Sequence, residues 1–277
     1  MSCPRRCRRP PGKGWAVPTP KPPRHVPSTS GRQPGRSATA FIPARHLKPH
    51  YRVEGHFYQL AVPGAEPLPC RSVLEITALE AGHPSPPADA IFVMMNPGSS
   101  KPIHATPQVV GCDHVAEMPA GLAATRPDTT QYQIMRVMHH AGWQRVRVIN
   151  LSDLREPRSA TFAQRYIALE KRDGGRAHSV FAPQRATELR RHLARKPQAP
   201  IVCAWGVGKR LDPLIAQATG ALASDAVTGL AKPDAPGKYF HPLPTLQRDK
   251  EQWVAGLLAQ LQREGWLPPP PHRRTTA

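Results

Sequence analysis

The chain has 277 residues and a formal net charge of +19, with 38 Lys or Arg against 19 Asp or Glu. This length allows one or two domains with a sizeable core, and the positive charge favours a polyanionic partner, of which nucleic acid is the commonest. No stretch of the sequence approaches the roughly 18 consecutive apolar residues of a membrane-spanning helix, so we expect a protein that does not cross a membrane.

The first segment of the chain is basic and poor in apolar residues. Residues 1–53 contain 12 Lys or Arg and no Asp or Glu, with Pro, Gly and Ser throughout. Because so little apolar surface cannot offset the entropy of ordering, we predict a disordered basic arm over residues 1–45. Two alternatives to a DNA-binding arm remain. The arm could bind an anionic membrane surface, or the translation start could be placed too far upstream. The predicted DNA contacts in the arm are Arg5, Arg6, Arg8 and Arg9.

The arm also bears on localisation and metal binding. Its dense prolines argue against an amphipathic targeting helix, and no apolar segment for secretion follows, so we expect a cytoplasmic, nucleoid-associated protein. Cys3 and Cys7 have a spacing that could serve a metal, but no second pair accompanies them, and we predict no metal centre. Cys203 lies within an apolar run and is predicted to be a core residue.

Strand patterns begin after the arm. Residues 57–62 and 72–78 predict two strands, the second of them half-exposed because apolar and polar residues alternate. Residues 91–96 (IFVMMN) form a continuous apolar run that stops at Asn-Pro-Gly. Such a run is typical of a strand buried on both faces of a parallel sheet, and the proline that follows cannot continue it.

Helical and strand patterns then alternate. Residues 130–141 predict a helix with Thr129 or Thr130 as its cap, and residues 146–151 (VRVINL) predict the next strand. An exposed amphipathic helix is predicted over residues 182–195, and a further strand over 201–206 (IVCAWG).

The last patterns are a weak strand at 238–242 and a helix at 249–263. Strands that alternate with helices predict an α/β fold of three αβα layers around a central, mostly parallel sheet. One domain over residues 46–267, followed by a disordered tail at 268–277, accounts for the whole pattern.

Polar residues follow the predicted strands at their carboxyl ends, where the ligand crevice of an open α/β sheet lies. Asn96 follows the first apolar run, Asn150 follows the second together with Ser152 and Asp153, and His241 lies in a His-Pro turn. An asparagine can hold a water by hydrogen bonds, and a histidine can stabilise charge that develops on a substrate oxygen. Each also has a structural explanation, since Asn-Pro-Gly is a common turn and turn histidines are often satisfied locally.

Four short motifs resemble the uracil-DNA glycosylase superfamily. The segment FVMMNPGSS resembles its first active-site motif, and the mismatch-specific thymine/uracil branch has an Asn-Pro-Gly after a buried strand. FHPLP resembles the second motif, VINL resembles the strand whose Asn reads the pyrimidine edge, and AWG resembles the strand before the second motif. The spacing of these segments with DTTQYQIMR is also similar to the uncharacterised bacterial DUF1643 family. Both resemblances cover roughly residues 88–262.

The resemblance implies a uracil-DNA glycosylase-like fold and a monofunctional DNA glycosylase that cleaves the N-glycosidic bond of a flipped pyrimidine and leaves an abasic site. Asn96 would position the attacking water, His241 would hydrogen-bond the base carbonyl, and Asn150 would recognise the base. No metal or other cofactor is implied, and we expect a monomer that acts on DNA. The further substrate contacts would be Pro97, Gly98, Ser99, Ser100, Asp128 and Trp205, and Lys101 would contact DNA.

Two departures from the superfamily bear on specificity. The classical uracil enzymes of the superfamily have an Asp in place of Asn96 and an aromatic residue in place of Gly98, and a tyrosine there would block a substituent at the base 5-position. Gly98, Ser99 and Ser100 leave that space open, so we expect a damaged, mismatched or 5-substituted pyrimidine, in DNA repair or, for phage-type bases, in antiviral defence. The alternatives are a nucleic-acid-binding module that keeps the fold without the chemistry, and a hydrolase of free nucleotides or nucleosides. No phosphate-binding glycine motif of an ATP or NAD enzyme is present.

Overall fold

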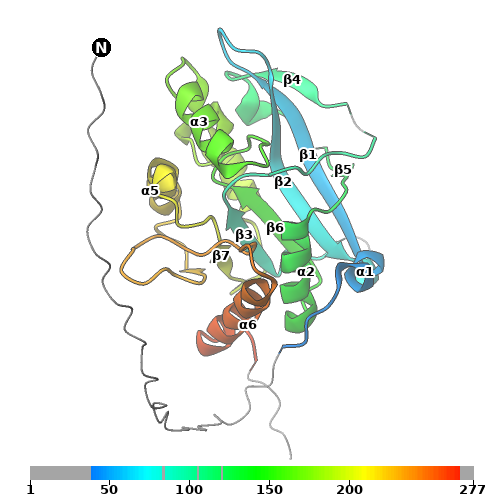
Figure 1. The fold of residues 1–277 in the computed structure, drawn as a ribbon. Coiled ribbons are helices and arrows are strands. Elements are labelled where there is room, and N and C mark those ends of the chain that lie inside the picture. Colours follow the sequence, from blue (N-terminus) through cyan, green and yellow to red (C-terminus); the bar gives the residue numbers. More distant parts are fainter. Residues whose placement is uncertain (1–38, 83–84, 105, 120, 269–277) are drawn as a thin grey trace, which may run out of the picture. The chain divides into compact units, whose positions relative to one another are not determined.

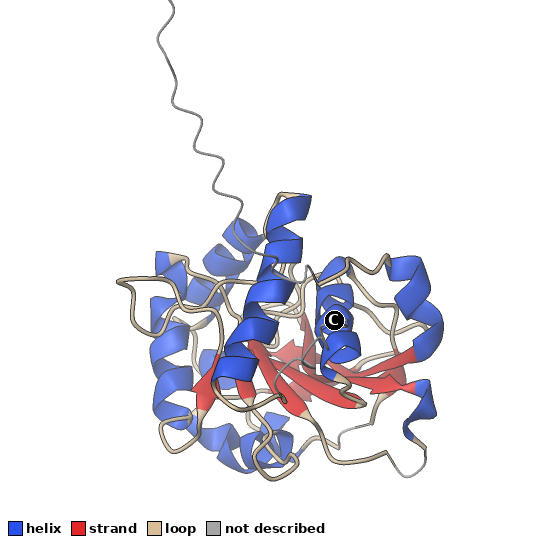
Figure 2. Ribbon diagram, turned by 90° about the horizontal axis from the view of Figure 1, so that it is seen from below, coloured by secondary structure: helices blue, strands red, loops and turns tan. Residues whose placement is uncertain are grey.

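The computed structural model describes residues 39–82, 85–104, 106–119 and 121–268. These residues form an α/β fold around one mixed sheet (Figure 1). Figure 2 shows helices on both sides of the strands. The predicted disorder of the arm (1–45) and of the tail (268–277) falls mainly on residues outside these ranges.

The sheet is mixed: the strands formed by the continuous apolar runs are parallel, the β1–β4 and β7–β8 pairs are also parallel, and the other pairs are antiparallel. Its order is β4-β1-β2-β6-β3-β7-β8, with β5 paired to β1. Strands β6, β3, β7 and β8 are parallel neighbours, whereas β2 runs antiparallel to both β1 and β6. The strands are β1 (Tyr51–Ala61), β2 (Leu68–Ala78), β3 (Ala90–Met94), β4 (Gln108–Gly111), β5 (Ala123–Ala124), β6 (Arg145–Asn150), β7 (Ile201–Cys203) and β8 (Val227–Thr228).

The helices cover the two faces of the sheet with separate sets of apolar residues. One core cluster contains residues of α3, α4 and α5, and the other contains residues of α1, α2 and α6. Strand β3 is buried at all five positions because Val93 faces the first cluster and Phe92 faces the second. The helices are α1 (Ala44–Leu47), α2 (Thr129–Ala141), α3 (Ser159–Leu169), α4 (Ala186–His192), α5 (Asp212–Ala221) and α6 (Gln247–Arg263).

Several predicted elements differ from those in the structure. Strand β2 is buried along nearly its whole length rather than half-exposed, because it lies between β1 and β6 and its Glu75 is paired with arginines. Residues 238–242 form no strand, only isolated bridges through Tyr239. The helix predicted over 182–195 is shorter, because a 3₁₀ turn with Pro183 at its start precedes α4. The cap of α2 is Asp128, not a threonine.

Other expectations concern the core and the chain as a whole. Cys203 is a buried free cysteine, as predicted. Residues 40–42 contact α2 through hydrogen bonds from Arg136 and His140, so the folded unit includes residues before the expected boundary at 46. Among the described residues, no helix combines the length and the apolar character that a membrane span requires.

Candidate functional site

The carboxyl ends of β6, β3 and β7 lie side by side at one edge of the sheet (Figure 1). Met94 is in register with Asn150, and Val93 is in register with Cys203. The pairing continues past the strand ends, where the N–H of Leu151 donates to the Met94 carbonyl at 2.8 Å. The polar residues that follow these strands are therefore held at a common edge, as the parallel arrangement predicts.

Asn96 is fixed at this edge by its amide nitrogen. Nδ2 donates to the carbonyl oxygens of Leu154 at 3.1 Å and Glu156 at 2.7 Å, in the loop that follows β6. Both amide hydrogens are thereby engaged. No hydrogen bond from a described residue reaches Oδ1, so this oxygen is the atom of the side chain that can accept a hydrogen bond from a water.

The turn after Asn96 requires glycine and opens toward a carboxylate. Gly98 has φ +63°, a conformation that strains residues with a side chain. A Cβ atom at this position would lie 3.7 Å from Oδ2 of Asp128. Asp128 caps α2, where its Oδ1 accepts from the Gln131 N–H at 3.0 Å and the Gln131 side chain accepts from the Asp128 N–H at 3.2 Å. The glycine therefore leaves the space beside a fixed negative charge unfilled.

His241 is held as a neutral imidazole. Its Nδ1 accepts a hydrogen bond from the Leu243 N–H at 3.2 Å, which places the ring hydrogen on Nε2. Burial lowers the pKa of His241 to about 4, so the ring is uncharged near neutral pH. The residue lies beside the end of β7, because a Cβ atom on Gly206 would be 4.0 Å from Cβ of His241. The result is a hydrogen-bond donor without a net charge, and no acceptor for Nε2 is found in the described part of the chain.

The first turns of α2 connect the segment that contains Asn96 and Gly98 with the segment that contains His241. Gln133 is fully buried, and its Nε2 donates to the carbonyl oxygens of Pro242 and Lys250, both at 2.9 Å. Its Oε1 accepts from Arg136 at 2.6 Å. The start of α2 thus lies beside the Gly98 turn at Asp128 and is hydrogen-bonded to the His241 segment through Gln133. Gln133 was not among the predicted site residues, although its position four residues before Val137 on the apolar face of the helix was a signal.

Asn150 is buried and bridges two parts of the edge. In the amide orientation that satisfies both its groups, Nδ2 donates to the Asn96 carbonyl oxygen and Oδ1 accepts from Nη2 of Arg71, both at 3.3 Å. Arg71 is itself buried, and its Nε and Nη1 have no partner in the described structure. Burial lowers the pKa of Arg71 to about 10, which leaves it charged near neutral pH. In this conformation Asn150 faces protein groups, and its recognition of a base stays a prediction.

The remaining predicted residues are divided between the core and the surface. Trp205 is buried, donates from Nε1 to the Gly237 carbonyl at 3.0 Å and packs edge-on against Tyr239, so neither ring face is free for a base. Pro97 and Ser100 are buried, whereas Ser99 and Lys101 are exposed. The four arginines of the arm lie outside the described residues.

Asp153 and Ser152 have structural partners. The Asp153 carboxylate accepts from the Tyr58 hydroxyl at 2.8 Å and from Arg185 at 2.7 Å, and all three side chains are buried. The Ser152 hydroxyl lies 2.8 Å from Nδ1 of the buried His178. These contacts hold the loop after β6 in place beneath the Asn96 side chain.

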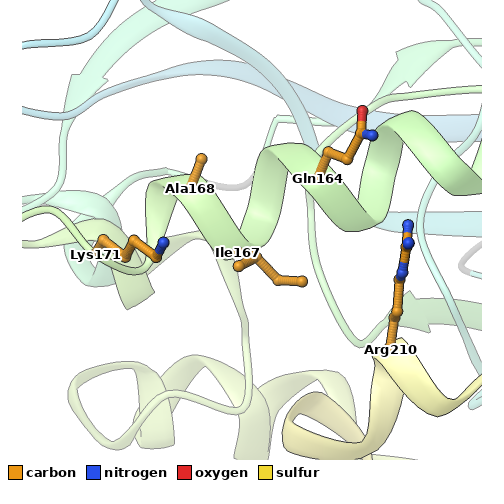
Figure 3. A pocket seen from close by; sticks show the side chains of 5 residues that line it. All are labelled: Gln164, Ile167, Ala168, Lys171 and Arg210. Carbon is orange, nitrogen blue, oxygen red and sulfur yellow. The ribbon is translucent and has the colours of Figure 1, made fainter.

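Two cavities lie away from this edge. One, of about 390 Å³, lies between α3 and the 3₁₀ turn Lys209–Leu211 and is lined by Gln164, Ile167, Ala168, Lys171 and Arg210 (Figure 3). The other, of about 240 Å³, adjoins β2, β6 and α4. Neither cavity is lined by Asn96, Asn150 or His241, so the polar edge and the cavities are separate features.

Comparison with known proteins gives no further assignment. No protein-family model matches the sequence, and neither a curated protein nor a solved structure matches it. The likeness to the uracil-DNA glycosylase superfamily therefore rests on the four short sequence motifs alone.

Proposed function

We propose that the protein is a DNA glycosylase that hydrolyses the N-glycosidic bond of a damaged, mismatched or 5-substituted pyrimidine. The observation that carries this proposal concerns two residues at one edge of the sheet. Asn96, with its unengaged amide oxygen, follows β3, and a neutral His241 whose Nε2–H is available lies beside Gly206 after the neighbouring strand β7. Neither group requires a metal to act on a sugar–base bond. The protein would act as a monomer on nucleoid DNA.

The proposed reaction breaks the bond between the sugar C1′ and the base nitrogen. The base leaves with the bonding electron pair, while the water held by Asn96 Oδ1 forms a bond to C1′ and gives its proton to solvent. His241 donates a hydrogen bond to the base carbonyl oxygen as negative charge develops there. The base anion then takes a proton from solvent, so the products are the neutral free base and an abasic sugar. The carboxylate of Asp128, beside Gly98, favours the positive charge that develops on the sugar.

The charge of the folded part supports a DNA substrate. Residues 39–268 hold 27 Lys or Arg against 19 Asp or Glu. A base in duplex DNA must leave the stack before it can reach a buried edge, at a cost of a few kcal/mol. Contacts between cationic side chains and the DNA backbone offset part of this cost.

The test is base release from defined DNA by the full chain. Duplex and single-stranded oligonucleotides that each carry one uracil or one 5-hydroxymethyl pyrimidine, and a duplex with one mismatched thymine, are incubated with excess protein, and the freed base is measured by mass spectrometry. His241→Ala should slow release about 10²–10³-fold without loss of DNA affinity, because the donor acts mainly in the transition state. His139→Ala, at an exposed position on α2, is the matched control and should act as wild type.

Three outcomes would overturn the proposal. DNA binding without abasic sites would indicate a binding module of this fold. Release from free nucleosides but not from DNA would indicate a nucleoside hydrolase. Wild-type release by His241→Ala would show that this histidine is only a turn residue.

A further inference from the structure

A cleft on the α3, α4 and α5 side of the sheet is built differently from the proposed glycosylase site. Strands β2 and β6 supply Glu75, Arg145 and Arg147, and helix α4 supplies Glu188 and Arg191. The volume of about 240 Å³ equals that of roughly eight water molecules at ~30 Å³ each. The cleft therefore suits a small molecule.

Arg147 is fixed in the floor of this cleft. Its Nε donates to Glu75 at 2.6 Å, and its Nη1 donates to the carbonyl oxygens of Arg191, His192 and Ala194 at 3.2, 2.9 and 3.0 Å. The guanidinium thus caps the end of α4. Its Nη2 has no hydrogen-bond acceptor within the described ranges, so a preorganised donor is left over.

Arg145 shares the same carboxylate. Its Nε donates to Glu75 at 3.0 Å and its Nη1 donates to the Pro86 carbonyl at 2.8 Å, while its Nη2 likewise has no acceptor among the described residues. One carboxylate therefore serves two guanidinium groups. The side chains of Arg145 and Arg147 are only 18% and 12% exposed, which strengthens their interaction with any anion that enters.

The second carboxylate of the cleft, Glu188, is already neutralised by the buried Arg185. Glu188 accepts two hydrogen bonds from the buried Arg185, both at 2.8 Å, and lies 3.2 Å from His192. Although burial disfavours its charge, hydrogen bonds from His192 and Arg185 lower the pKa of Glu188 to about 2. The exposed guanidinium of Arg191 has no acceptor in the described structure. Positive charge and unused N–H donors are therefore in excess around the cleft.

We infer that this cleft binds a small free oxyanion, a carboxylate or phosphate group, whose short apolar part contacts Met118 and Leu122 at the rim. Guanidinium groups bind such oxygens through paired, charge-assisted hydrogen bonds. The low exposure of Arg145 and Arg147 favours a small molecule over a DNA phosphodiester, which needs cations at the surface. The inference does not depend on the glycosylase proposal.

Calorimetric titration of the full chain tests this site with two probes, inorganic phosphate and benzoate, at constant ionic strength. Wild-type protein should bind at least one of them saturably at one site. Arg191→Ala should weaken that binding about tenfold or more, because it removes a charge-assisted donor. Arg190→Ala is the matched control, since it removes the same charge from a neighbouring exposed position outside the cleft. Circular dichroism checks that both variants are folded.

Each alternative result overturns the inference in a different way. Absence of saturable binding by either probe would show that the cleft takes no oxyanion. Equal weakening by Arg191→Ala and Arg190→Ala would indicate general charge screening. Displacement of the probe by a short DNA duplex, with duplex affinity lowered by Arg191→Ala alone, would assign the cleft to the DNA backbone.

Discussion

At the scale of single residues, hydrogen bonding decides which atoms of the proposed site can act. Asn96 uses its nitrogen to hold the loop after β6, which leaves the oxygen for a water. His241 uses Nδ1 to hold its own turn, which leaves Nε2–H for a substrate oxygen. In both residues a structural contact and the proposed chemistry use different atoms, so substitutions can separate the two roles.

The first prediction concerns Asn96. Asn96→Ala leaves the carbonyls of Leu154 and Glu156 without their donor and should lower the free energy of unfolding by about 1–3 kcal/mol. Asn96→Asp places a carboxylate oxygen against the same two carbonyls and should lower it further at pH 7.5. Because these carbonyls favour the protonated carboxyl group, the loss should diminish as the pH is lowered to 5.

Denaturant unfolding at the two pH values checks this prediction. Ser99→Ala, at an exposed position in the same turn, serves as the control and should change stability by less than about 0.5 kcal/mol. Wild-type stability of Asn96→Asp at pH 7.5 would contradict the assigned hydrogen bonds.

The second prediction concerns the charge state of His241. The unfolded chain protonates a histidine below pH 6.5, but the folded chain keeps His241 neutral down to about pH 4. Stability of the wild type should therefore fall as the pH falls through this window, with a contribution from His241 of up to about 3 kcal/mol. His241→Asn keeps an acceptor for the Leu243 N–H and should flatten the stability profile between pH 6.5 and 4. Thermal melts across the window provide the measurement, and an unchanged profile would argue against a buried neutral imidazole.

At the scale of elements, α2 is the part that brings the motif segments together. Gln133→Ala removes the donor of the buried Pro242 carbonyl and of the partly buried Lys250 carbonyl, and should cost about 2–4 kcal/mol of unfolding free energy. Base release should slow as well, since the His241 segment loses its anchor. Gln164→Ala, at an exposed position on α3, is the matched control. Equal stability of Gln133→Ala and Gln164→Ala in urea would show that Gln133 does not anchor the His241 segment.

Local sequence patterns predicted some elements and not others, for identifiable reasons. Strand β3 was predictable because a five-residue strand buried on both faces leaves a continuous apolar run. The antiparallel β1–β2 pair was not, because strand direction follows from the chain's path and not from local periodicity. Helix α3 was missed because alanines dilute its apolar stripe, and α5 because its buried stripe is limited to Leu214, Ile215 and Ala218.

The candidate site, like the fold, was predictable from the sequence only in part. Asn96 and His241 stand in short motifs, and the structure places Asn96 after β3 and His241 beside the segment that follows the neighbouring strand β7. The buried Arg71 that contacts Asn150 carries no signal in the sequence, because nothing near it distinguishes an arginine that faces the core from one on the surface. Contacts between distant parts of the chain decide that difference.

At the scale of the whole molecule, the junction between the arm and the folded unit can be located by truncation. Phe41 lies under the Arg136 guanidinium at 4.4 Å, and Arg136 Nε donates to the Ile42 carbonyl at 2.8 Å. Deletion of residues 1–38 should therefore leave the melting temperature unchanged. Deletion of residues 1–44 should lower the unfolding free energy by about 1–3 kcal/mol, since it removes both contacts. Equal melting temperatures for the two truncated proteins would contradict this boundary.

The same deletion tests the proposed role of the arm on DNA. Residues 1–38 hold 9 Lys or Arg, and each phosphate contact contributes about −0.9 to the slope of log affinity against log salt. Removal of residues 1–38 should weaken DNA binding and reduce this slope. A slope equal to that of the full chain would show that the arm makes no contact with DNA phosphates.

The anchoring of Gln133 also has a consequence for the order of folding. Its two acceptors, Pro242 and Lys250, lie 109 and 117 residues further along the chain. During synthesis, the start of α2 therefore emerges long before the groups that complete its hydrogen bonds. Contacts of such long sequence separation form late, because the entropy of closing a long loop must be overcome first. The His241 segment should consequently be among the last parts of the protein to be anchored, together with the pairing of β3 with β7, which joins segments equally far apart in the chain.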